Sequence, residues 1–154
     1  MRNRDIFLRH SFYTTASPED FWIEVVHSEV YRSSKSKSNP KYLQKDGLRP
    51  ADFDKAADPF AEDKLLIPNP NKGLSFADSM ETLRNKKIRG KYLFRGQTAW
   101  MITPGPLPEG LVINYQDKSH PMINACRVML ESEFINKINT LLEQNRYICT
   151  NIKV

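Results

Sequence analysis

The side chains with the clearest potential for chemistry are an arginine near the start of the chain and a serine next to an aromatic residue. Arg9 falls within residues 6–13, which are rich in aliphatic and aromatic side chains and predict a strand. A guanidinium in that position can hold a diphosphate through two parallel hydrogen bonds. Ser75 and Phe76 lie on a short predicted strand, residues 73–76, where the hydroxyl can orient a ribose and the ring can stack on nicotinamide. Solvated or purely structural roles remain open for all three side chains.

Two glutamates, Glu131 and Glu133, add a candidate catalytic carboxylate. They begin residues 131–144, where apolar side chains recur at helical spacing and predict a helix. A carboxylate fixed in a dry cleft stabilises positive charge that develops as a leaving group departs. The alternative is that both acids occupy the first turn only because the helix dipole favours them there.

Histidine chemistry and nucleic-acid binding are weaker possibilities. His10 and His120 could form an acid–base pair like that of a ribonuclease, although isolated histidines are more often structural or solvated. The polar basic tract of residues 32–41 could hold phosphates. It lacks the interleaved aromatic side chains that stack bases, so an exposed loop is predicted there. The sequence shows no phosphate-binding glycine loop, zinc signature or nucleophile elbow.

Length and composition predict one domain, residues 1–154, with a real core. Apolar residues make up 40% of the 154 residues, and no apolar run is long enough to cross a membrane. The N-terminal apolar stretch is also too short for a signal peptide, so we expect a cytoplasmic protein or one exported without a cleaved signal. Cys126 and Cys149 are expected to be reduced and partly buried. The net charge of +5 favours phosphate-bearing or acidic partners without choosing among them.

The elements that must position these side chains are short strands and a few helices. Ser17, Pro18 and Asp20 resemble a helix start, and the apolar spacing from Phe21 onward predicts a helix to about Tyr31. Short helical turns are expected around residues 51–57. A further helix, capped by Asp78 or Ser79, is expected to end near residue 86. The remaining strands are predicted over residues 65–67, 73–76, 100–102, 111–115, 125–130 and 147–154. The pattern favours an α+β fold with a mixed, mostly antiparallel sheet and flanking helices, because strands and helices do not alternate regularly.

The order of these pieces resembles the ADP-ribosyltransferase-like toxins secreted by type VI systems. The segment Asn71-Lys72-Gly73-Leu74-Ser75-Phe76-Ala77-Asp78-Ser79 is similar to that family's glycine-containing segment ending in Ser-aromatic-Asp. Phe7-Leu8-Arg9 is similar to its opening strand. The other matching pieces, in order, are Trp100-Met101-Ile102, the turn Pro108-Glu109-Gly110-Leu111, residues 125–130 and the terminal helix. Glu131-Ser132-Glu133, which begin that helix, resemble the family's paired glutamates.

The resemblance implies an ADP-ribosyltransferase-like cleft that takes NAD as substrate and uses no metal. Arg9 would neutralise the NAD diphosphate, Ser75 would orient the nicotinamide ribose, and Phe76 would pack the cleft. Glu131 or Glu133 would stabilise the charge that develops as nicotinamide leaves. The chain departs from the family at two positions of the implied cofactor site. Leu74 stands where a small polar residue is expected, and Cys126 stands where a histidine is expected.

The implied biology is a toxin that acts in a target cell's cytosol and is neutralised by an acidic immunity protein. NAD could be transferred to a macromolecule, which the sequence does not name, or simply hydrolysed. A non-catalytic basic interaction module and a nucleic-acid-directed toxin using His10 or His120 remain the alternatives.

Overall fold

The computed structural model describes residues 22–33, 43, 48–60, 62–92, 99–144 and 146–148, with only the backbone described for residues 88 and 146–148. The predicted strand of residues 6–13 lies outside these ranges, and with it Arg9 and His10. Cys149 and most of the predicted strand of residues 147–154 also lie outside them.

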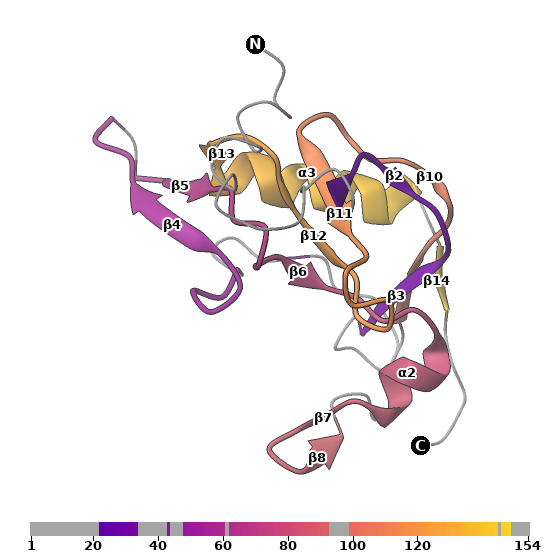
Figure 1. The fold of residues 1–154 in the computed structure, drawn as a ribbon. Coiled ribbons are helices and arrows are strands. Elements are labelled where there is room, and N and C mark those ends of the chain that lie inside the picture. The colour runs from indigo at the N-terminus through magenta and orange to yellow at the C-terminus, as the bar shows by residue number, and fades with distance from the viewer. Residues whose placement is uncertain are drawn as a thin grey trace.

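The largest described sheet has four antiparallel strands, in the order β1-β11-β12-β6 (Figure 1). Its strands are β1 (Trp22–Ile23), β11 (Leu111–Asn114), β12 (Met122–Ala125) and β6 (Leu74–Ser75). Both faces of β11 are covered, because Leu111 and Ile113 belong to the main core and Val112 packs with Trp22 and Cys126.

Two three-stranded antiparallel sheets both contact the long helix of residues 131–144. One sheet has β5 between β13 and β4, and the other has β9 between β14 and β3. The bounds are β4 (Asp54–Ala57), β5 (Lys64–Ile67), β13 (Met129–Leu130), β3 (Val30–Ser33), β9 (Ala99–Ile102) and β14 (Arg146–Ile148).

Two small two-stranded ribbons complete the described sheets. One ribbon pairs β2 (Val25–Val26) with β10 (Gly105–Pro106). The other is a hairpin of β7 (Lys87–Ile88) and β8 (Lys91–Tyr92), which projects beyond helix α2 in Figure 1.

Helix α3 (Glu131–Gln144) packs against β5, β13, β9 and β14. Its apolar stripe is buried, and the ring of Phe134 meets the ring of Phe53 edge-on with 5.2 Å between centroids. The stripe follows the helical period and is wide enough to cover two sheets, which explains why this segment is helical.

Helix α2 (Met80–Asn85) begins at Ser79, whose hydroxyl accepts a hydrogen bond from the backbone N–H of Thr82. This cap satisfies one of the free N–H groups of the first turn. The helix buries Leu83, packs against β3 and is followed by its C-cap residue, Lys86. It thus leads from the four-stranded sheet to the β7–β8 hairpin.

A pair of backbone hydrogen bonds joins β3 to the segment that follows β6. The N–H of Tyr31 donates to the carbonyl of Ala77 at 2.8 Å, and the N–H of Ala77 donates to the carbonyl of Tyr31 at 2.7 Å. This bridge links two otherwise separate sheets.

The predicted helix ending near Tyr31 is wrong wherever the structure describes it, because β1, β2 and β3 occupy that stretch. The segment is rich in β-branched and aromatic side chains, which favour strands. Each short strand has an antiparallel partner, on β11, β10 and β9 respectively. Arg32 and Ser33, predicted to begin an exposed loop, instead end β3.

Two further predictions are wrong. The helical turns expected around residues 51–57 give way, from Asp54, to strand β4, which pairs with β5. The single strand expected over residues 125–130 is two strands, because β12 ends at Ala125 and β13 begins at Met129. In the segment between these two strands, the N–H of Cys126 donates a hydrogen bond to the carbonyl of Gly110.

Other predictions are confirmed. Helix α3 has the predicted bounds, α2 has the predicted serine cap, and strands occur at β5, β6, β9 and β11. The described fold is therefore mixed α+β with mostly antiparallel sheets. Neither described helix combines the length and apolar character needed to cross a membrane.

Candidate functional site

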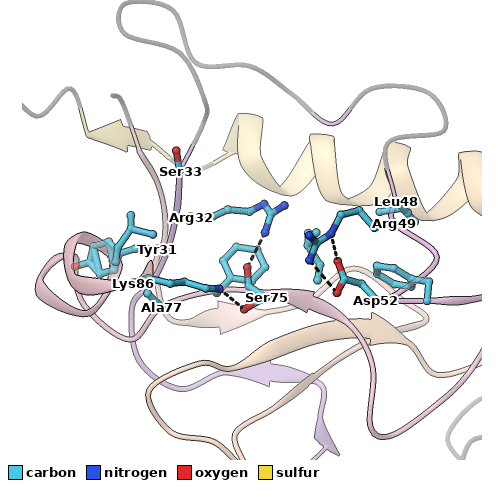
Figure 2. Close-up of a pocket in the computed structure, with 13 residues that line it drawn as sticks. Tyr31, Arg32, Ser33, Leu48, Arg49, Asp52, Ser75, Ala77 and Lys86 are labelled. Atoms are coloured by element: carbon cyan, nitrogen blue, oxygen red, sulfur yellow. Dashed lines mark hydrogen bonds and ion pairs between the residues drawn. The ribbon is translucent and has the colours of Figure 1, made fainter. Parts of the chain in front are cut away.

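A pocket with a cavity volume of about 100 Å³ lies where β3, β6, the end of α2 and residues 48–53 meet (Figure 2). Its apolar lining includes Leu48, Phe53, Leu74 and Phe76. A water molecule needs about 10–15 Å³ on this scale, so the space holds several waters or a small polar group.

Arg32 enters the pocket from the end of strand β3. Its Nη1 donates to the backbone carbonyl of Ser75 at 2.7 Å, and its guanidinium carbon lies 6.0 Å from the centre of the Phe76 ring. Burial lowers the pKa of Arg32 to about 10, an effect that nearby Asp52 opposes and Arg49 reinforces. Its charge is thus held in a poorly solvated place.

Arg49 and Asp52 line the opposite side of the pocket and bind each other. Arg49 donates from Nε at 2.7 Å and from Nη2 at 3.2 Å to the two carboxylate oxygens of Asp52. Figure 2 shows the guanidinium groups of Arg32 and Arg49 pointing toward one another. Asp52 is therefore paired with Arg49, and its charge also favours the charged form of Arg32.

Lys86, the C-cap residue of α2, supplies a third positive charge. Its Nζ donates to the hydroxyl oxygen of Ser75 at 3.3 Å. Burial lowers the pKa of Lys86, and the charges of Arg32 and Arg49 lower that pKa further. The described lining thus carries three cations and one carboxylate, a formal excess of two positive charges.

The wall of residues 48–53 is tied to helix α3 by a buried ion pair. Lys55 Nζ donates to the carbonyl of Leu48 at 2.5 Å and lies 2.6 Å from Oε2 of Glu131. Glu131 is 1% exposed. The pair therefore fixes the segment that carries Arg49 and Asp52.

The structure brings three of the predicted site residues together. Leu74, Ser75 and Phe76 all line the pocket, with the Ser75 hydroxyl bound to Lys86 and the Ser75 carbonyl bound to Arg32. Arg9 lies outside the described residues. Its predicted role stays a prediction, and Arg32 supplies a guanidinium at this pocket.

The two predicted glutamates are not part of the lining. Glu131 is buried behind the wall with Lys55. Glu133 lies on the outer face of α3, where its carboxylate is 2.6 Å from Arg127 and 3.1 Å from Lys137. Both cations also contact Glu109, so Glu133 belongs to a surface network of four charges.

Cys126 also lies apart from the pocket. It packs with Trp22 and Val112, and burial raises the pKa of its thiol to about 11, with Glu24 and Glu109 adding to the shift. His120 lies in the loop between β11 and β12 and is not among the residues of the lining. The roles predicted for Glu131, Glu133 and Cys126 remain untested.

Sequence reasoning missed the charged residues of the pocket: Arg32, Arg49, Asp52 and Lys86. One clue was available, because the sequence Val30-Tyr31-Arg32-Ser33 ends a run of β-formers and could have extended the strand to Arg32. Nothing local joins Arg32 to residues 49 or 86, which only the folded chain brings together.

Within the described part of the chain, no group of three or more His, Cys, Asp or Glu side chains could hold a metal ion. Comparisons of the whole chain with protein-family models, with curated proteins and with solved structures give no match in any of the three.

Proposed function

We propose that the pocket holds the diphosphate of NAD and that the protein is a toxin of the ADP-ribosyltransferase type. The observation that carries this proposal is the excess of two positive charges around a partly enclosed space, beside a serine hydroxyl and an aromatic ring. The two negative charges of a dinucleotide diphosphate match that excess.

The electrostatic argument rests on Arg32 and Lys86. Neither cation forms an ion pair with a described carboxylate, and burial works against the charge of both. A buried charge is costly unless it is paired. A bound phosphate would accept charge-assisted hydrogen bonds from both groups and would remove the mutual repulsion of the cations.

The chemistry proposed for the site breaks the bond between the ribose C1′ and the nicotinamide nitrogen. The bonding electrons leave with nicotinamide, and C1′ becomes positively charged in the transition state. Water or an acceptor group then bonds to C1′ and loses a proton. In this proposal the Ser75 hydroxyl orients the ribose, and Asp52, the one carboxylate of the described lining, stabilises the positive charge.

Thermal unfolding with and without NAD tests the binding step. A ligand at 100 times its dissociation constant adds about 2.7 kcal/mol to the free energy of unfolding. For a chain of this size that corresponds to a rise in Tm of roughly 5–11 °C. Arg32→Gln and Lys86→Gln should each abolish the rise, whereas Lys118→Gln, which removes an exposed charge outside the pocket, should preserve it. Equal shifts in all four proteins would refute the assignment.

A non-catalytic binding module is the second candidate, and the positions of the glutamates favour it. Glu131 is buried with Lys55 and Glu133 is engaged by Arg127 and Lys137, so neither carboxylate is presented to the pocket. Nicotinamide release separates the two functions. Release that is lost in Ser75→Ala supports the transferase, and NAD binding without any release supports the binding module.

A further inference from the structure

The β7–β8 hairpin is a cationic projection next to the pocket. The run Arg84-Asn85-Lys86-Lys87-Ile88-Arg89-Gly90-Lys91-Tyr92 contains five cations and no acid. Of these, Lys87, Arg89 and Lys91 are exposed, and none of the three forms an ion pair with a described residue. Their charges are therefore available to an external partner.

The turn of the hairpin has an arginine where the backbone conformation favours Asn or Gly. Arg89 has φ 53° and Gly90 has φ 78°, the pair of positive values that a type I′ turn requires. Asn or Gly is preferred at the first of these positions, and other side chains there are strained. Arginine in the turn thus places an exposed charge at the tip of the hairpin.

The hairpin also presents an aromatic ring among its cations. Tyr92 is 44% exposed and pairs across the ladder with Lys87, whose Nζ lies 4.7 Å from the ring centre. In such an arrangement the cations can bind phosphates while the exposed ring stacks on a base. An acidic protein partner would more typically meet a cluster of apolar anchors, and the described side chains of the hairpin offer only Tyr92.

We propose that the β7–β8 hairpin binds the backbone of a nucleic acid, with Lys87, Arg89 and Lys91 contacting phosphates and Tyr92 stacking on a base. This surface lies outside the pocket, and the proposal does not depend on NAD binding.

Fluorescence anisotropy with a labelled single-stranded RNA, at several salt concentrations, tests the proposal. Each phosphate contact with a single strand adds about 0.7 to the slope of log K against log salt. Lys87→Gln combined with Lys91→Gln should therefore reduce the slope by about 1.4. The matched control is Lys64→Gln with Lys118→Gln, which removes two exposed charges elsewhere and should leave the slope unchanged. Tyr92→Leu should weaken binding without changing the slope.

Repeating the measurement with a duplex of the same sequence distinguishes a preference for single strands from general binding to the phosphate backbone. Either result supports the proposal if the hairpin variant binds more weakly than the wild type. Equal loss in the hairpin variant and the control would overturn it, as would binding to poly-glutamate but not to RNA. The NAD-induced rise in Tm should persist in the hairpin variant, so the two proposals fail separately.

Discussion

Replacing Glu131 by glutamine should destabilise the protein, because it leaves the Lys55 ammonium buried without its counter-charge. The side chains of Lys55 and Glu131 are 11% and 2% exposed, and among the described residues neither carboxylate oxygen accepts a well-directed hydrogen bond. Breaking a buried ion pair by removing one partner costs about 3–5 kcal/mol. Lys55 would keep its bond to the Leu48 carbonyl, which favours the lower end of that range.

Denaturant unfolding monitored by tryptophan fluorescence measures this loss. A loss of about 3 kcal/mol also corresponds to a fall in Tm of roughly 6–12 °C. Glu133→Gln is the matched control, since its side chain is 36% exposed and exposed pairs contribute about 0–1 kcal/mol. Changing Lys55 to methionine and Glu131 to leucine together should restore most of the stability, because two apolar side chains leave no unpaired charge.

The opposite result would be informative. If Glu131→Gln unfolded like Glu133→Gln yet lost nicotinamide release, Glu131 would be a catalytic residue and the structural role argued for it would be refuted.

Three further changes probe stability and the frame of the pocket. Glu109→Gln should lower stability at neutral pH by under about 1 kcal/mol, given an exposed side chain. The hydrogen bond from Arg127 lowers the pKa of Glu109 from 4.5 to about 2. The stability that Glu109 contributes is therefore full above pH 4.5 and is lost as the pH falls to about 2. Urea unfolding at neutral pH and at about pH 2 would show this loss. Ser79→Ala should cost about 1 kcal/mol by removing the cap of α2, measured by thermal unfolding. Gly73→Ala would place a Cβ 2.9 Å from the carbonyl oxygen of Ile123, and the shift of β6 should cost about 1–3 kcal/mol and weaken NAD binding by calorimetry.

How much the sequence predicts depends on how long each pattern is. Helix α3 was predicted with its bounds because four turns repeat one apolar period, which no strand could satisfy. Residues 22–33 have apolar side chains whose spacing fits a helix over a short stretch. Their β-branched composition fits strands, and the partners that decide the matter, β9, β10 and β11, lie more than 60 residues away along the chain.

The sequence predicts only those residues of the candidate site that are neighbours along the chain. Ser75 and Phe76 were recognised because they are neighbours in one segment. Arg32, Arg49 and Lys86 each belong to a different segment, and each reads alone as a solvated charge. Their convergence is a property of the tertiary fold.

The backbone bridge between Tyr31 and Ala77 has a consequence for how such a site can diversify. It fixes the spacing between the strand that carries Arg32 and the strand that carries Ser75 through peptide groups alone. Substitutions of the lining side chains can then alter which ligand is accepted while the dimensions of the frame persist. Evolution can thus change the ligand specificity of the pocket through single substitutions while the backbone around it stays the same.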